Sequence, residues 1–220
     1  MTRLLFAAIL PLFLAFCSPS KDKVIDEGII EYDSKVVDES HPLAGLAPSS
    51  ATLKFKKDKF LMEMSTMGMF NTFFVCDLKT KTLTQMVKFM DVKQACIEDE
   101  NAIKKENASF PIKIEETNET KEIAGYTCTK IKVTKLTEPQ TVFEAYYTKD
   151  MGMEAVNALS PYAGVKGMLM QYRLRKMGLE MQFTARSVKK ADIPESTFEV
   201  PAYFKIVSQD EMKKFFDGLQ

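Results

Sequence analysis

The chain of 220 residues has few of the residues on which enzymatic and metal sites depend. It contains one histidine, His41, no tryptophan and four cysteines. Nucleophilic triads and most zinc sites need imidazole as a base or a ligand, and no two cysteines have the two-residue spacing of a zinc or redox motif. Glycine-rich phosphate loops and nucleophile elbows are also missing. We therefore expect no catalytic residues, no metal and no cofactor.

An excess of charge of either sign is missing as well. Lys+Arg and Asp+Glu both number 30, and the charged fraction of 27% is ordinary for a globular protein. Nucleic-acid binding requires a sustained positive field, so we expect no nucleic-acid partner. Acidic runs such as Glu98-Asp99-Glu100 and Glu115-Glu116 are interpreted as solvated turns.

The N-terminus carries the longest apolar run. Arg3 precedes the run Leu4 to Phe16, which only Pro11 interrupts, and the chain becomes polar from Ser18. The run is shorter than the roughly 20 residues that a membrane span needs. A basic start, a short apolar stretch and an abrupt polar boundary predict a signal peptide over residues 1–16. A buried core helix is the alternative.

The end of this run resembles the lipobox of bacterial lipoproteins. Leu14, Ala15 and Cys17 match, whereas Phe16 stands where that family has a small residue. The resemblance implies that Cys17 is acylated, as with palmitate, and anchors a tether over residues 17–26. We then expect a lipoprotein of the bacterial cell envelope, held in the outer membrane and facing the periplasm. The alternative is a cysteine that lies by chance near an ordinary cleavage site.

The remainder, residues 27–220, is expected to form a single domain of curved antiparallel sheet. Apolar and polar residues alternate with period two between polar corners, most clearly over Thr127 to Lys135 and its partner Thr141 to Thr148. Met168 to Arg175 and Leu179 to Lys189 form another predicted hairpin. The fold class is therefore mainly β (α+β), with one to three covering helices.

Two segments have helical spacing. Met151 to Lys166 is predicted to form a short helix or helical loop that ends near Pro161. Ser208 to Leu219 is predicted to form a helix, because Ser208 and Glu211 have the spacing of a capping box.

Three cysteines remain beside Cys17. An exported location permits disulfides, and three thiols allow one bridge. If one forms, we expect Cys76 with Cys96. The alternative is that Cys76, Cys96 and Cys128 are buried free thiols.

Methionine is abundant, with 14 residues. Several pairs are two residues apart, which on a strand places both thioethers on one face: Met62/Met64, Met67/Met69, Met151/Met153 and Met168/Met170. Thioethers bind Cu(I), but flexible methionine also suits an adaptable apolar lining. We favour a lining for a hydrophobic ligand made by Met62, Met64, Met69, Phe73, Val133, Phe143, Met170, Met181 and Phe183.

The segments Ile123–Lys130, Ala145–Asp150, Gly178–Met181, Phe183–Ala185 and Phe198–Pro201 together resemble a group of bacterial envelope lipoproteins with a domain of unknown function. That group is similar to LolA/LolB-like lipoprotein carriers. The resemblance spans about Gly28 to Phe216. It implies a curved antiparallel half-barrel whose hollow is covered by helices, and a lipid or acyl chain as ligand. It implies no catalytic residues.

Two hypotheses follow. The first is a lipid-anchored, non-enzymatic envelope protein that binds a lipid, an acyl chain, an acylated protein or another hydrophobic ligand in a concave sheet. The second is a structural or assembly partner in the cell envelope. A methionine-rich Cu(I) binder is a third hypothesis.

Overall fold

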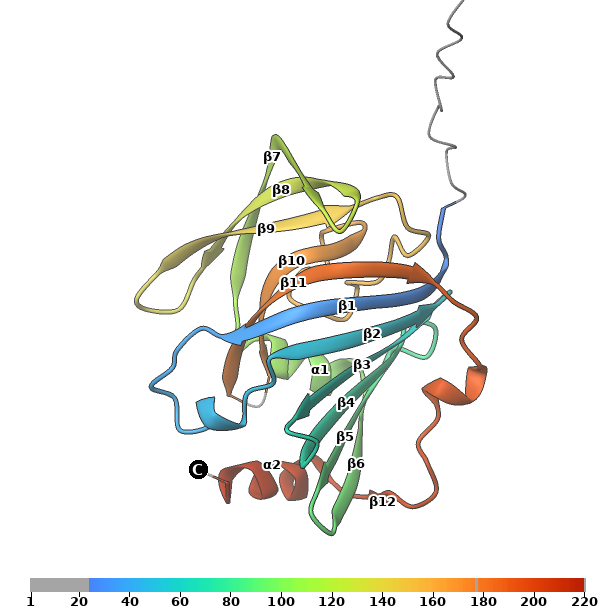
Figure 1. Ribbon diagram of the computed structural model, residues 1–220. Coiled ribbons are helices and arrows are strands. Elements are labelled where there is room, and N and C mark those ends of the chain that lie inside the picture. Colours follow the sequence, from blue (N-terminus) through green and yellow to red (C-terminus); the bar gives the residue numbers. More distant parts are fainter. Residues whose placement is uncertain (1–23, 177, 220) are drawn as a thin grey trace, which may run out of the picture.

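The computed structural model describes residues 24–176 and 178–219 (Figure 1). The predicted signal peptide, Cys17 and most of the tether lie outside the described residues, so these stay predictions. Within the described ranges, neither α-helix has the length and apolar character needed to cross a membrane.

Within residues 24–176 and 178–219, twelve strands form one sheet in the order β12-β6-β5-β4-β3-β2-β1-β11-β10-β9-β8-β7. The strands are β1 (Glu27–Val36), β2 (Ser50–Lys56), β3 (Lys59–Thr66), β4 (Phe70–Asp77), β5 (Thr82–Phe89), β6 (Val92–Glu98), β7 (Ile112–Ile123), β8 (Tyr126–Lys135), β9 (Thr141–Thr148), β10 (Met168–Lys176), β11 (Leu179–Lys190) and β12 (Lys205–Ile206). Every pairing between named strands is antiparallel except β12 with β6. The predicted fold class is confirmed.

Short turns connect β2 through β6, β7 through β9, and β10 to β11, whereas longer connections join β1 to β2, β6 to β7 and β9 to β10, and β1 lies between β2 and β11. Ala124 and Gly125 join β7 to β8, with φ of 51° and 83°. Positive φ at both central positions is the geometry of a hairpin turn that matches the twist of the strands, and glycine adopts it at no steric cost.

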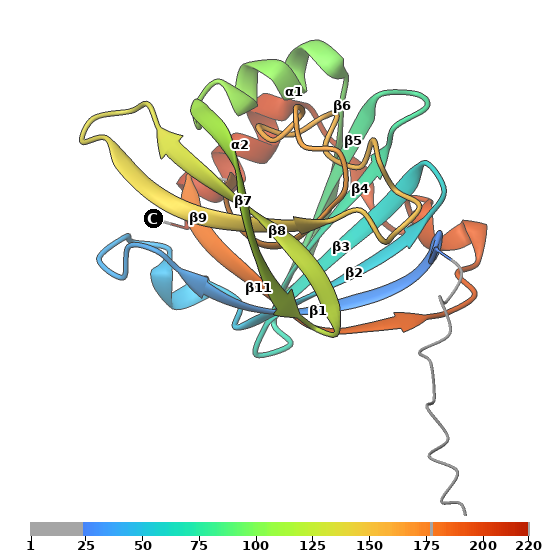
Figure 2. The same cartoon turned by 90° about the horizontal axis from the view of Figure 1, so that it is seen from above.

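The two faces of the sheet are covered differently. Figure 2 shows the curved sheet with α1 (Glu100–Asn107), α2 (Gln209–Asp217) and residues 151–167 on its concave side. The opposite face of β3 to β6 packs against the C-terminal segment that includes the 3-10 turn η2 (Glu195–Phe198). A second 3-10 turn, η1 (Ala44–Leu46), lies in the β1–β2 connection. Both helices therefore lie over the hollow, as predicted.

We call residues 151–167 the bowl segment. Of the two structures predicted for Met151 to Lys166, the short helix is wrong, because the segment forms successive turns and is a loop. The Asn157 amide donates to the carbonyl oxygens of Val165 and Gly167, at 2.9 and 2.8 Å. A Cβ at Gly167 would collide with the backbone of Thr148. The helical spacing of the apolar residues was misleading here. The Asn157 side chain, rather than a helical backbone N–H, bonds the carbonyl oxygens, and Pro161 has no N–H to donate in a helix.

Helix α1 was not predicted. The Asp99 carboxylate accepts from the backbone N–H of Ala102 at 2.8 Å and caps it. The acidic run Glu98–Glu100 is therefore a strand end and a helix start, and Glu98 is only 7% exposed. The capping box of α2 is confirmed, since Ser208 and Glu211 bond each other's backbone N–H groups.

The expected Cys76–Cys96 disulfide is wrong for this structure, in which Cys76, Cys96 and Cys128 are buried free thiols. Cys76 lies on β4 and Cys96 on β6, with β5 between them. Two strand spacings amount to about 10 Å, which exceeds the roughly 7 Å that a disulfide spans between Cα atoms.

Candidate ligand-binding cavity

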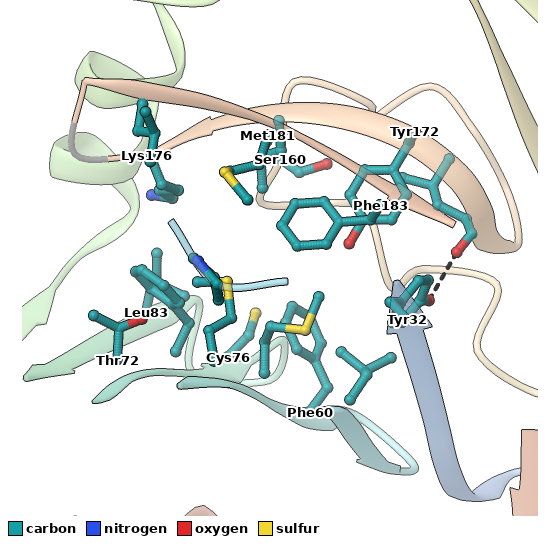
Figure 3. A pocket seen from close by; sticks show the side chains of 18 of the residues that line it. Tyr32, Phe60, Thr72, Cys76, Leu83, Ser160, Tyr172, Lys176, Met181 and Phe183 are labelled. Atoms are coloured by element: carbon teal, nitrogen blue, oxygen red, sulfur yellow. Dashed lines mark hydrogen bonds between the residues drawn. The ribbon is translucent and has the colours of Figure 1, made fainter. Parts of the chain in front are cut away.

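The concave face forms a partly open cavity of about 160 Å³ (Figure 3). Strands β1 to β5 line one side and β10 and β11 the other. The bowl segment, α2, Asn107 of α1 and the β1–β2 connection complete the wall. Protein interiors contain few voids larger than a water molecule. A void of this size between a sheet and its covering segments is therefore a distinct feature of the fold.

The register of the strands brings apolar side chains together in the cavity wall. Met62 of β3 lies opposite Leu53 of β2 and Phe74 of β4, and Met64 lies opposite Thr72. Because side chains alternate between the faces of a strand, these directly opposed residues share the concave face. All five line the cavity.

An aromatic cluster forms the wall beneath the bowl segment. Tyr172 stacks on Phe183 with ring centroids 5.2 Å apart, and Tyr32 meets Tyr172 edge-on at 6.0 Å. The Tyr32 hydroxyl donates to the Leu169 carbonyl oxygen at 2.8 Å. Burial raises the pKa of the Tyr32 and Tyr172 phenols well above the usual range. This part of the wall is therefore uncharged at neutral pH, and the Tyr32 hydroxyl fixes it to the backbone of β10.

Most polar groups in the lining are occupied by the protein's own backbone. Asn107 donates to the Leu159 carbonyl oxygen at 3.0 Å, and the Ser160 hydroxyl donates to the Asn157 carbonyl oxygen at 2.9 Å. These bonds hold the bowl segment in place. They leave the cavity surface largely apolar.

Lys176 is different, because it brings a charge to the lining. Its ammonium group pairs with the Glu106 carboxylate of α1 and lies 5.8 Å from the centre of the Phe74 ring. Figure 3 shows Lys176 reaching from its strand towards the residues of the opposite strands. Glu98 lies close to this pair. Burial, and then the charge of Glu106, raise the pKa of Glu98 above 4.5.

Cys76 lines the cavity, but its chemistry is that of an apolar side chain. Burial raises the pKa of its thiol from 9.0 to about 12. The thiolate is the reactive form of cysteine. At neutral pH this thiol is therefore a poor nucleophile and contributes volume and packing.

Four of the nine residues expected to line a ligand site lie in the cavity wall: Met62, Met64, Met181 and Phe183. Val133, Phe143 and Met170 are buried in the same apolar core but do not reach the cavity.

Phe73 and Met69 lie elsewhere. Phe73 occupies the opposite face of β4, where its ring meets Phe204 at 6.4 Å. Met69 lies in the β3–β4 turn and is 65% exposed. The turn begins with Met67 at φ 50°, which breaks the alternation that a continuous strand would have had.

The cavity wall also contains residues that the sequence patterns missed. Tyr32 and Leu53 lie on strands whose alternation was visible, whereas Val156, Tyr162 and Phe216 come from the covering segments. No periodicity identifies which covering side chain closes a hollow.

Across the described ranges, no group of three His, Cys, Asp or Glu side chains is arranged to hold a metal ion. His41 accepts a hydrogen bond at Nδ1 from the backbone N–H of Leu43, at 3.2 Å. The methionine-based Cu(I) site stays a prediction, although Met67 and Met69 are separated from the cavity pair Met62 and Met64.

Neither a family model nor a curated protein matches this sequence. Among solved structures, PNGF-II is similar with a TM-score of 0.52 and 14% identity, over 88% of this chain and 34% of that chain. A putative outer membrane lipoprotein-sorting protein domain from Vibrio parahaemolyticus aligns with a TM-score of 0.24 and 8% identity, over 81% of this chain and 92% of that domain. The likeness to PNGF-II is one of fold alone. The present chain spans about a third of the PNGF-II structure.

Proposed function

We propose that this protein binds the acyl chain of a lipid or an acylated protein in the cavity on its concave face. The observation that supports this proposal most strongly is the cavity itself, which apolar and aromatic side chains line on both sides. Burying apolar ligand surface there contributes about 25 cal/mol per Å². No catalytic role is proposed for any residue.

The size and softness of the wall favour a flexible ligand. An engineered apolar cavity of about 150 Å³ stays dry and binds benzene, so about 160 Å³ admits a short stretch of acyl chain without rearrangement. Longer chains require side chains to move. Met62, Met64, Met168 and Met181 line the cavity, and unbranched methionine adapts readily to the shape of a ligand.

The location completes the proposal. A lipid on Cys17 would hold the domain at a bacterial envelope membrane, in our proposal the outer membrane on its periplasmic side. Each buried methylene of such an anchor contributes about 0.8 kcal/mol. Cys17→Ser is expected to release the protein into the soluble envelope fraction and to abolish labelling by a palmitate analogue. A variant that remains membrane-bound and labelled would contradict this anchor.

Ligand binding is tested by two single-tryptophan variants, because the natural chain has no tryptophan. Met64→Trp places an indole in the cavity wall, and Met69→Trp places one in the exposed turn of the same hairpin. On titration with decanoyl lipids, the emission of the first should shift while that of the second stays constant. Equal responses, or none, would count against binding in the cavity. Mass spectrometry of lipids co-purified with the full chain identifies the natural ligand class.

The assembly-partner hypothesis gives a different result in cells. In-cell crosslinking would then yield one dominant protein adduct, and the purified protein would carry no lipid apart from the anchor proposed on Cys17. The Cu(I) reading predicts binding that is lost when Met62, Met64, Met67 and Met69 become Leu. Unchanged Cu(I) affinity in that variant would exclude a Cu(I) site made by these methionines.

A further inference from the structure

Lys176 is the sole charged residue among those that line the cavity in the described part of the chain. It lies at the end of β10, on the same face as Tyr172 and Leu174, so strand alternation aims it inward. Its side chain is 16% exposed. A cation in an otherwise apolar wall marks one end of the cavity as the place for the polar part of an amphiphilic ligand.

The Lys176 ammonium is only partly satisfied by its protein partner. It donates to Glu106 Oε2, and its Nζ lies over the face of the Phe74 ring. An ammonium group has three N–H donors. It can therefore keep its pair with Glu106 and still donate to an oxygen placed in the cavity.

The charge balance at this end disfavours an anion. Glu106 already neutralises Lys176, and Glu98 lies beside them with an Oε2 atom that has no hydrogen-bond partner among the residues the structure describes. Burial and the nearby Glu106 favour the protonated form of Glu98. An added carboxylate would face Glu106 across Lys176, and the remaining lining residues supply no second cation.

We propose that Lys176 donates a hydrogen bond to the carbonyl oxygen of an uncharged acyl ester or amide, so that the cavity selects esterified chains over ionised fatty acids. This inference rests on the proposed function and specifies its ligand class. An ester carbonyl accepts a hydrogen bond and adds no charge, so the Lys176–Glu106 pair stays intact.

The test uses the full chain and displacement of a fluorescent acyl probe at about pH 8. The competitors are methyl decanoate and decanoate, which share one chain and differ in charge. Wild type should bind the ester at least about tenfold more tightly. Lys176→Met should weaken ester binding about tenfold, the scale of a hydrogen bond to a charged group. Lys190→Met, which removes an exposed lysine on β11, should change neither competitor.

Glu106→Gln tests the same pair from its acidic side. It removes the carboxylate that neutralises Lys176, so decanoate affinity should rise about tenfold while ester affinity changes less than about threefold. The double variant Lys176→Met/Glu106→Gln removes both charges of the pair, so no unpaired charge stays buried. It should bind the ester as weakly as Lys176→Met, and its circular dichroism should be that of the folded protein.

Three results would overturn the inference. If the probe binds but Lys176→Met and the double variant leave ester affinity unchanged, the polar group lies elsewhere, and the proposed function stands. If wild type prefers decanoate and Lys176→Met abolishes that preference, the lysine is a carboxylate site. If no acyl probe binds wild type, the proposed function falls together with this inference.

Discussion

Replacing Cys76 by methionine tests whether the cavity is real and empty. Cys76 is 1% exposed and lines the void. Cys76→Met adds two carbon atoms, which can extend into the empty space. At about 0.8 kcal/mol per buried methylene, their burial contributes about 1.6 kcal/mol.

Cys96→Met is the matched control. Cys96 is 2% exposed and packs in the core beneath α2, and unlike its neighbours Phe70 and Phe216 it does not line the cavity. Because Cys96 does not line the cavity, the added atoms have to displace neighbouring core side chains, and overpacking costs about 1 to 3 kcal/mol. Both variants lose similar side-chain entropy when methionine is ordered. That loss cancels in the comparison, so their free energies of unfolding should differ by at least about 2 kcal/mol.

Urea denaturation followed by circular dichroism measures this difference. With a slope of about 2 kcal/mol per molar urea, the midpoint of Cys76→Met should lie about 1 M above that of Cys96→Met. Cys76→Met should also bind the acyl probe several-fold more weakly, because it occupies ligand space. Equal destabilisation by the two substitutions would refute an empty cavity at Cys76.

Three other substitutions test the frame around the cavity. Tyr32→Phe should lower the free energy of unfolding by about 1 to 3 kcal/mol in urea titrations, because the Leu169 carbonyl loses its buried donor; no loss would mean that this bond does not hold the wall. Ser208→Ala should cost about 1 kcal/mol and speed amide exchange in α2, and unchanged exchange would contradict the capping role. Burial and Glu106 raise the pKa of Glu98 above 4.5, so the folded state keeps this proton where the unfolded chain has lost it. Glu98 therefore lowers stability as the pH rises above about 4.5, and Glu98→Gln should gain stability relative to wild type as the pH rises from there through the raised pKa of Glu98 in the folded state; a constant difference would refute the shift.

Strand faces were predictable from the sequence because alternation is a local property. Met62 and Met64 are two residues apart on a continuous strand, as are Met181 and Phe183, and all four line the cavity. Alternation does not reveal which face of a strand becomes concave. Phe73 was therefore assigned to the wrong side of β4, while its neighbours Thr72 and Phe74 line the void.

Other features depend on contacts between distant segments. Glu98 is buried because α1 and β10 bring Glu106 and Lys176 over the end of β6, a juxtaposition that no local pattern encodes. The bowl segment has helical spacing, but Asn157 ties its backbone into turns. The sequence also could not predict whether the concave face is filled by side chains, because this depends on how far the side chains of the covering segments reach into it.

Native mass spectrometry of the full chain, released from membranes in mild detergent, tests the central claim most directly. Our account predicts a one-to-one adduct with the mass of an uncharged acyl ester or amide lipid, which Cys76→Met depletes and Cys96→Met retains. A protein that carries no lipid apart from the anchor on Cys17, or one whose non-covalently bound lipid is unaffected by the substitution at Cys76, would contradict ligand binding in the concave cavity.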